Sequence, residues 1–595
     1  MSRRARLADN PRQLSLGPVI FKLFAPIPLR PAPVTMVFMA AFAYRLPAIC
    51  LGCPPCGPLS DGCSISTPAP SVDCCHCDRV AYGQLLALAD GGYPLDHGHP
   101  LLPFHGSRSG PAGVGMSFGL PSQMGKCTHN AHNALILRHL SLPPNACQMP
   151  LFNFFLHNQQ VRDTYIRGFH NYLDSGNLDQ WMGNRTKEKL QRIAHSKAFD
   201  SLRLQHAKSF IKQEVSAALP SKARLIQGNL NEATAYNTPV AYVAAGEALK
   251  AVGTTSFKQD GVTFHLKYTS GLNHDDLSDL VTEWVSEAGS AYYLDERDGK
   301  NWDSTMQREH MMAEAAVYAL ADASLGANHL LRSTQCKGCI SLKDAVVKYV
   351  TAWKRLSGDW NTAVGNATIS MIIVVTVILW LPLSLRPKTV RALFMGDDYL
   401  GFYIYDVLPD KQALTTALNT GERYCGITPE RALFTNILDV SYISLGFWPR
   451  IDGGLQAVPH PAKQMRKLFW THRHFPPLHP EVHATALARA FLPTYARFPL
   501  MEKFLAAHLF RKTLQHQRYD YGDRKYAIQF ASTKSRDVHW QAGFVHKYRL
   551  PYGACNFDLP SPSGLVVLHH PVVSHMLVYE SSPPMDRLAW PVAPQ

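Results

Sequence analysis

The sequence predicts an α+β protein, because strand-like and helix-like segments both occur along the chain. Residues 291–298 have the composition of a strand, and residues 391–407 that of a strand, a tight turn and a second strand. Residues 304–323 instead have the apolar spacing of a helix. Apolar residues make up 46% of the 595 residues and charged residues 17%, which is enough for a sizeable core.

Residues 1–115 differ from the rest because they are rich in Pro, Gly, Ser and Cys and show little periodicity. We predict a loosely structured arm. Paired thiolates with two residues between them can share a zinc ion, so the arm is a candidate Zn²⁺ module, with unligated cysteines as the equal alternative. The candidate ligands are Cys50, Cys53, Cys56, Cys63, Cys74 and Cys77. The scattered cysteines beyond the arm are typical of reduced thiols in a cytosolic protein.

Beyond the arm the composition becomes typical of a globular protein. Residues 186–215 have apolar residues at mixed spacings of three and four, which predicts a helix. The helix over 304–323 is predicted to begin with a capping box formed by Ser304 and Gln307. Residues 546–595 are rich in Pro, His and Val and are predicted to form an irregular tail.

Residues 367–385 carry no charge and are as long and apolar as a transmembrane helix. Their β-branched residues and Pro382 fit a buried core element followed by a turn equally well, and we expect the core element. The apolar stretch at 34–44 has only 11 residues, which is short for a span.

The charge balance is basic, with 59 Lys and Arg against 45 Asp and Glu and a net charge of +14. This excess suits a polyanionic partner, either nucleic acid or an anionic membrane.

Two carboxylates, Asp397 and Asp398, lie side by side in the strand-like apolar stretch 394–400. Adjacent like charges repel and are costly to bury unless a cation or hydrogen bonds compensate, so a solvated turn and a metal site are both open. Nucleotidyl transfer needs two divalent cations held by oxygen ligands from more than one strand. Asp298 ends the predicted strand at 291–298 and offers such a ligand. Asp303 follows it at the turn into a helix.

Residues 357–366 lie between these carboxylate segments and have the sequence SGDWNTAVGN. Ser357 and Gly358 form a flexible turn that can donate and accept hydrogen bonds. Thr362 and Asn366 are four residues apart and share one helix face. This polar stripe at the head of an apolar helix suits recognition of a sugar edge.

The three segments follow the order D-x4-D, SG-x3-T-x3-N and GDD, and in this order the chain resembles the RNA-dependent RNA polymerases of positive-strand RNA viruses. A lone GDD is a weak signal, but three motifs in order are a strong one. The segment DGKNWDSTM resembles the tombusvirus, nodavirus and flavivirus-like branches more than the picornavirus branch. The similarity spans roughly 120–500, including a basic fingertip motif at 210–228 and a strand and turn linking palm to thumb at 442–450.

The resemblance implies a right-hand polymerase with fingers, palm and thumb and an antiparallel palm sheet. It places the apolar stretch 367–385 directly behind the active site. The implied division is 1–115 for the arm, 116–290 for the fingers, 291–440 for the palm with a fingers insertion near 305–350, 441–545 for the thumb and 546–595 for the tail.

The resemblance also implies two-metal nucleotidyl transfer with Mg²⁺, or Mn²⁺ in its place. Asp298 and Asp397 would bridge the ions, and Asp398 would support the site. The family often uses a lysine as the general acid, but the nearest cation here is Arg431, which rarely gives up a proton. Lys411 comes too early, so no acid is assigned.

Two further sets of residues would bind the incoming nucleotide. The ribose 2′-hydroxyl is assigned to Asp303, Thr362 and Asn366, with Ser357 in the same network. The triphosphate is assigned to Lys222 and Arg224, with Lys212 as a weaker candidate.

The implied function is template-directed RNA synthesis that replicates a viral positive-strand RNA genome. The partners would be the RNA template and product, ribonucleoside triphosphates and membrane-associated replication proteins. The expected location is the host cytoplasm, at membrane-associated replication complexes. A reverse transcriptase is the alternative within the same class, although GDD replaces its usual Tyr-x-Asp-Asp. A non-catalytic, membrane-bound RNA-binding scaffold would explain the charge, the cysteines and the apolar stretch, but not the ordered motifs.

Overall fold

A computed structural model describes the chain from residue 83 to residue 588 with gaps. The described residues are 83–87, 98–100, 122–124, 128–141, 143–175, 206–212, 224–229, 237–299, 301–342, 346–467, 487–506, 509, 537–555, 571–582 and 584–588. They all lie within one compact unit, Arg79–Gln595. The candidate zinc ligands and Lys222 lie outside the described residues.

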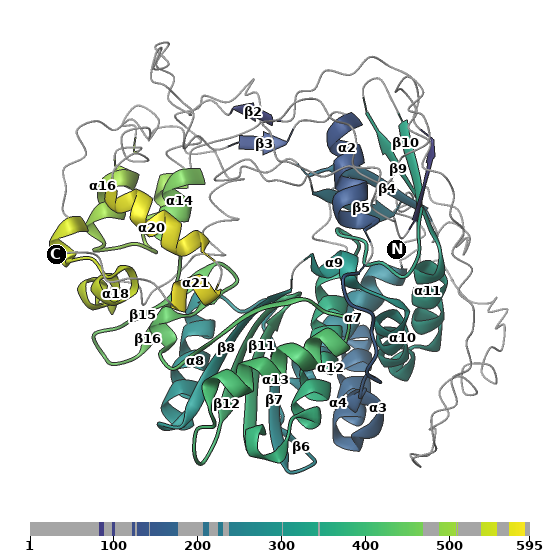
Figure 1. Cartoon of the computed structure of the whole chain (residues 1–595), viewed down its shortest axis with the longest axis horizontal. Helices are drawn as coiled ribbons and strands as arrows, with labels where there is room; N and C mark the ends of the chain where they lie inside the picture. The colour runs from purple at the N-terminus through teal and green to yellow at the C-terminus, as the bar shows by residue number, and fades with distance from the viewer. Residues whose placement is uncertain are drawn as a thin grey trace, which may run out of the picture. The chain divides into compact units, whose positions relative to one another are not determined.

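The central element is a six-stranded sheet with the order β13-β8-β12-β11-β7-β6 (Figure 1). Its strands are β6 Phe257–Gln259, β7 Val262–Tyr268, β8 Tyr292–Gly299, β11 Thr389–Met395, β12 Asp398–Ile404 and β13 Pro429–Phe434. The predicted strand at 291–298 and the predicted strand, turn and strand at 391–407 are confirmed. The prediction of an antiparallel sheet is wrong for one pair, since β11 and β7 are parallel. The segment between these two strands, which includes β8, is long enough for the crossover that a parallel pair requires.

Helices cover both faces of this central sheet. On one face lie α7 Asn237–Val252, α12 Thr362–Trp380 and α13 Lys411–Tyr424 (Figure 1). On the other face lies α8 (His274–Ala288), whose Trp284 meets Phe402 with ring centroids 5.5 Å apart. Successive residues of β12 serve the two cores in turn, because Tyr399 packs with α12 and Leu400 with α8. Burial of the sheet on both faces explains the predominantly apolar sequences of β11 and β12.

Helix α12 contains most of the apolar stretch that the sequence predicts to be a core element. Residues Val364 to Ile378 are all buried. By length and composition this helix could cross a membrane, and 83% of its most apolar window is buried inside the protein. The helix ends at Trp380, and Pro382 precedes a single 3₁₀ turn at Leu383–Leu385. The predicted buried element and turn are therefore confirmed.

A second sheet has the order β1-β10-β9-β4-β5. Its strands are β1 Gly83–Ala87, β4 His206–Ile211, β5 Leu225–Asn229, β9 Cys336–Ser341 and β10 Val346–Thr351. Helix α2 (Thr128–Ala134) and the π-helical turn η1 (Leu135–His139) pack against it. The helix predicted over 186–215 is wrong for residues 206–211, which form β4. Buried and exposed residues alternate along this strand, and a period of two favours a sheet. Residues 186–205 lie outside the described residues.

Three helices connect the two sheets. They are α9 Trp302–Thr305, α10 Arg308–Ala321 and α11 Ala323–Thr334. The helix predicted over 304–323 is confirmed, but its predicted capping box is wrong. The cap is Gln307, which pairs with His310, and the Ser304 hydroxyl donates instead to the carbonyl of Asn301 at 2.8 Å. The chain turns between α9 and α10, so Ser304 belongs to the first helix and cannot cap the second.

The remaining described elements are shorter. Before the central sheet come β2 Gly98–Pro100, β3 Ser122–Met124, α3 Phe154–His157 and α4 Gln159–Asp174. After it come η4 Ile437–Asp439, β14 Ser441–Tyr442, β15 Leu445–Pro449, β16 Leu455–Pro459, α14 Pro461–Lys467, α16 Pro499–Ala506, α18 Trp540–Tyr548, η7 Tyr552–Cys555, α20 Pro571–Ser581 and α21 Pro584–Leu588.

The prediction of an irregular tail after residue 545 is wrong where the structure describes it. Helix α20 packs on α14, and its Glu580 accepts hydrogen bonds from the backbone N–H groups of Ala462 at 3.1 Å and Lys463 at 2.7 Å. Helix α21 packs on β13, and its Arg587 forms an ion pair with Glu296 of β8. These buried polar contacts stabilise helices that the Pro-rich sequence alone does not predict.

Candidate active site

The adjacent carboxylates lie at the tip of the β11–β12 hairpin. Met395 pairs with Asp398, so Gly396 and Asp397 form a two-residue turn. Gly396 has a φ of 66°, the left-handed conformation that tight hairpin turns require and that glycine adopts without strain. The turn leaves Asp397 partly exposed and Asp398 exposed at the edge of the central sheet.

The end of β8 lies beside this hairpin. Strands β8 and β12 are antiparallel, and Tyr399 pairs with Arg297 as the last residue pair. One residue further along each strand are Asp298 and Asp398, so the ladder brings these carboxylates to the same sheet edge. The structure thus unites the two carboxylate motifs as the sequence predicts.

Helix α9 holds Asp303 next to that edge. Asn301 turns the chain with a φ of 53°, a left-handed conformation that asparagine tolerates better than most residues. Trp302 packs so closely on Gly299 that a β-carbon there would stand 2.4 Å from the indole ring. The backbone N–H of Arg355 donates to the carbonyl of Asp303 at 3.1 Å. These contacts fix Asp303 relative to the strand that carries Asp298.

The electrostatics show that the four aspartates lie near one another. Burial and the charge of Asp303, followed by that of Asp298, raise the pKa of Asp397 to about 6, against a smaller lowering effect of Arg224. The pKa of Asp398 is raised to about 7. Neighbouring protein atoms that displace water contribute most, followed by the charges of Asp397 and Asp298, although the residue is exposed at the surface. Ionisation of each carboxylate is therefore disfavoured, and a nearby positive charge would favour it.

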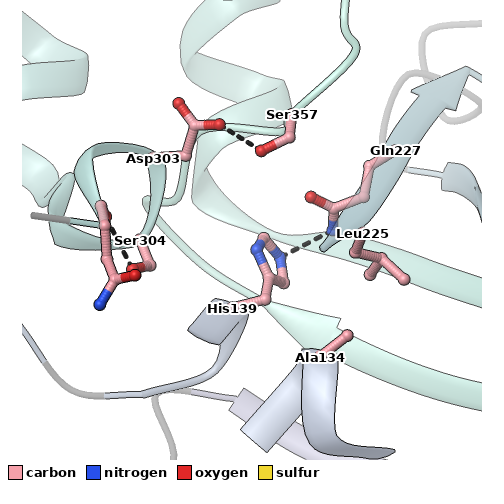
Figure 2. Close-up of a pocket in the computed structure, with 8 residues that line it drawn as sticks. Ala134, His139, Leu225, Gln227, Asp303, Ser304 and Ser357 are labelled. Carbon is pink, nitrogen blue, oxygen red and sulfur yellow. Dashed lines mark hydrogen bonds between the residues drawn. The ribbon is translucent and has the colours of Figure 1, made fainter. Parts of the chain in front are cut away.

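Asp303 accepts hydrogen bonds on both carboxylate oxygens. Ser357 donates its hydroxyl to Oδ2, and Figure 2 shows the two side chains pointing toward each other. The Nδ2 of Asn366 donates to Oδ1 at 2.9 Å. Asp303, Ser357 and Asn366, which the sequence assigns to one nucleotide-binding network, thus form one set of hydrogen bonds.

Thr362 lies apart from this set. Its hydroxyl contacts the carbonyls of Leu356 at 2.8 Å and Asp359 at 2.9 Å, and it lies 3.2 Å from the N–H of Gly358. The side chain therefore organises the turn before α12, and it contacts the nucleotide-binding network through the turn that positions Ser357.

A buried group that the sequence analysis missed supports Asn366. We call it the Arg355 cluster, and it consists of Glu314, Tyr318, His329, Arg355 and Asn361. Burial alone would raise the pKa of Glu314, but Arg355 and His329 hold it below its usual value, so Glu314 is a buried anion. Glu314 is the single charge in the apolar stretch MMAEAAVYALA, and a charge in such a setting is a sequence signal for a buried ion pair.

A second buried group lies behind β8. We call it the Arg431 cluster, and it consists of Asp295, Arg297, Ser370, Tyr403, Glu422 and Arg431. Burial alone would lower the pKa of Arg431. The negative charges of Asp295 and Glu422 outweigh burial and raise this pKa above its usual value. Arg431 is thus held as a cation inside the core, which agrees with assigning it no role as a general acid.

A pocket lies between the second sheet and the nucleotide-binding network (Figure 2). Asp303 and Ser357 line one side, and His139 and Gln227 line the other, where Gln227 donates to His139 at 2.8 Å. Burial, and then the charge of Lys354, lower the pKa of His139 to about 3, so this histidine is neutral. The N–H of Gln227 donates to the carbonyl of Ser357 at 2.5 Å, which links β5 directly to the site.

The basic candidates lie at the adjacent ends of the paired strands β4 and β5, and β5 lines the pocket. Arg224 is exposed just before β5, and its charge acts on Asp397. The N–H of Lys212, just after β4, donates to the carbonyl of Arg224 at 2.8 Å. Lys222 lies outside the described residues, so its contact with triphosphate stays a prediction.

The donor set fits a hard divalent cation, because carboxylate oxygens are the preferred ligands of Mg²⁺. Among the described residues, no group of three or more His, Cys, Asp or Glu side chains converges tightly enough to hold an ion. The aspartates therefore repel one another without enclosing a common point. The cysteines of the arm remain a prediction for zinc, since the structure does not describe them.

Comparison with known proteins agrees with this geometry. Residues 297–420 match the family described as viral RNA-dependent RNA polymerase, and this range includes the residues from Asp298 to Asp398 that the sequence assigns to the site. No match was found among curated proteins. Polymerases of this family take an RNA template and nucleoside triphosphates and use divalent metals. The α+β fold, the shared sheet edge and the family match together identify the chain as an RNA-directed RNA polymerase, a nucleotidyltransferase that carries out viral RNA synthesis.

Proposed function

We propose that this polymerase copies a viral positive-strand RNA genome by two-metal nucleotidyl transfer, in the manner of the tombusvirus, nodavirus and flavivirus-like branches. The observation that supports this most is the meeting of Asp298, Asp397 and Asp398 at one sheet edge, beside the hydrogen-bonded Asp303, Ser357 and Asn366. A right-hand layout, with the central sheet as palm and the second sheet as part of the fingers, belongs to the same proposal.

In the proposed reaction the 3′-hydroxyl oxygen of the growing RNA attacks the α-phosphorus of the incoming triphosphate. The bond from that phosphorus to the bridging oxygen breaks, and pyrophosphate leaves. Bound Mg²⁺ or Mn²⁺ would lower the pKa of the attacking hydroxyl and neutralise the leaving group. Asp298 and Asp397 would hold the two ions, and Asp398 would support them.

The chain's own residues would orient the nucleotide. Asp303, Ser357 and Asn366 would face the ribose, and Arg224 with Lys222 would neutralise the triphosphate. The basic excess of the chain would then serve the RNA backbone. A place at membrane-associated replication complexes in the host cytoplasm is also proposed, on the family resemblance alone.

The test is incorporation of labelled ribonucleotides on a defined RNA template by the purified full chain, with Mg²⁺ or Mn²⁺. The parent is expected to be active and Asp397→Ala inactive. Asp406→Ala is the matched control, because Asp406 is an exposed carboxylate paired with Lys388 near the opposite end of the same hairpin. Equal activity in the parent and Asp397→Ala would contradict the placement of the site. Preference for deoxyribonucleotides would favour a reverse transcriptase instead.

A further inference from the structure

We propose that Glu314 and Arg355 are positioning residues that set the enzyme's preference for ribose over deoxyribose. This inference rests on the proposed function of Asp303, Ser357 and Asn366. Neither residue reaches the nucleotide-binding pocket, and both act through the orientation of the Asn366 side-chain amide.

The amide of Asn366 has its orientation imposed by Arg355. The Nε–H of Arg355 donates to Oδ1 of Asn366 at 2.8 Å. Because a guanidinium only donates, the oxygen of the amide must face Arg355. The Nδ2 group is thereby directed to Asp303, where it donates at 2.9 Å. With the amide reversed, two donors would face each other in the protein interior.

Arg355 is in turn held by Glu314 through two parallel hydrogen bonds. Nη1 donates to Oε1 at 3.0 Å and Nη2 to Oε2 at 2.5 Å. Tyr318 and Asn361 donate to the same Oε1 atom at 2.7 and 3.0 Å. The ion pair is at most 1% exposed, and a bidentate pair of this kind fixes geometry as well as charge.

The packing around the pair allows it no freedom. A β-carbon at Gly365 would stand 2.1 Å from Oε1 of Glu314 and 2.7 Å from both terminal nitrogens of Arg355. The residue before Asn366 must therefore lack a side chain for the ion pair to sit beneath the helix. A buried ion pair is a weak source of stability, whereas a fixed orientation is a use that buried charges are known to serve.

The consequence concerns which sugar the pocket accepts. Ser357 and Asn366 occupy both oxygens of Asp303 and fix a set of donors and acceptors before any nucleotide binds. A 2′-hydroxyl can add a hydrogen bond to the remaining donors and acceptors of such a set, whereas a deoxyribose offers no group that can do so. Sites built to pair with a hydroxyl reject the analogue that lacks it most strongly when their polar groups are fixed.

The experiment compares kcat/KM for ATP and dATP on one RNA template, using the full chain. Arg355→Lys keeps the charge, but a single ammonium cannot pair with both oxygens of Glu314 and also donate to Asn366. We expect its ATP-to-dATP ratio to fall about tenfold, the scale of one hydrogen bond to a charged group. Glu314→Gln, which keeps the shape and removes the charge, is the second variant and is expected to shift the ratio in the same direction.

Arg431→Lys is the matched control, because Arg431 is equally buried between two carboxylates and contacts no nucleotide-binding residue. It is expected to lower stability and leave the ratio unchanged. In an Asn366→Ala background, Arg355→Lys should add no further fall in the ratio, since the two residues act as one unit. An unchanged ratio in both Arg355→Lys and Glu314→Gln, or the same fall in Arg431→Lys, would overturn the inference. Absence of ribonucleotide incorporation by the parent would instead overturn the proposed function.

Discussion

The Arg355 cluster and the Arg431 cluster are built from the same chemistry, yet they end on different groups. In each, an arginine with no more than 1% of its side chain exposed binds a carboxylate that is equally buried. Beyond Arg355 the hydrogen bonds continue to Asn366 and so to Asp303. Beyond Arg431 they continue to Tyr403 and, through Glu422 and Arg297, to Ser370, all within the core. A buried charge therefore does not indicate a function by itself. The residues to which its hydrogen bonds lead must also be known.

The largest effect is expected when the Arg431 cluster is broken. Arg431→Met leaves Asp295 without its ion pair and Glu422 with Arg297 alone. Leaving a buried charge uncompensated costs about 3–5 kcal/mol, so chemical denaturation should show a fall of this size in the free energy of unfolding. The ATP-to-dATP ratio of the folded fraction should stay at the parent value. A loss below about 1 kcal/mol would mean that the cluster contributes little to the scaffold.

A smaller effect is expected from crowding the Arg355 cluster. Gly365→Ala forces a methyl group against Glu314 and Arg355, and overpacking of this kind costs about 1–3 kcal/mol. Here the ATP-to-dATP ratio should fall as well, unlike in Arg431→Met. Gly246→Ala in α7 is the control, since its β-carbon would meet nothing closer than Tyr268 at 3.7 Å. That variant should be as stable as the parent or more so, because alanine favours helix.

A change at Thr362 separates the local turn from sugar recognition. Thr362→Val removes the hydroxyl contacts with Leu356 and Asp359, at an expected cost of about 1 kcal/mol in unfolding free energy. The ATP-to-dATP ratio should stay close to that of the parent, whereas Ser357→Ala should lower it. Equal falls in the two variants would show that Thr362 takes part in sugar recognition directly.

The smallest effect concerns pH. The folded-state pKa values of Asp397 and Asp398, about 6 and about 7, lie above the usual 3.8, so the folded protein binds more protons than the unfolded chain across this window. Repulsion among these carboxylates should therefore destabilise the chelator-treated protein as the pH rises from 5 to 8. Asp397→Asn should flatten this dependence, and Mg²⁺ should stabilise the parent at pH 8 more than the variant.

The comparison of parent and variant is needed because other groups titrate in the same range. Burial lowers the pKa of His139 to about 3 and that of His274 and His310 to about 4, which destabilises the fold toward acid. These contributions cancel in the difference between parent and Asp397→Asn melting temperatures. We expect that difference to be modest, because Asp398 is exposed and screened by solvent. A variant profile as steep as that of the parent would contradict the assignment.

The sequence could predict features that depend on contacts between neighbouring residues, but not those that depend on contacts between residues far apart in the chain. The turn at Gly396 depends on its own φ angle and two flanking strands, so a short motif suffices to find it. Asn366 and Asp303 were assigned to one network because their motifs keep a fixed order. Arg355 lies in the irregular segment between β10 and α12, 41 residues from Glu314 of α10, and no local pattern identifies a partner at that distance. The apolar residues of β4 fit both the spacing of a helix and the alternation of a strand. Hydrogen bonding to β5 and β9 makes this segment a strand.

The ion pair between Arg587 and Glu296 carries a consequence for biosynthesis. The two residues are 291 positions apart, so strand β8 leaves the ribosome long before the helix that neutralises its carboxylate. At translation rates of about 5–20 residues per second, the delay is roughly 15–60 s. During that time Glu296, two residues before Asp298, lacks its ion-pair partner, although Ser441, whose N–H donates to it, is already synthesised. The polymerase fold is therefore completed late. A chain that stops before α21 lacks the ion-pair partner of Glu296, a residue of strand β8.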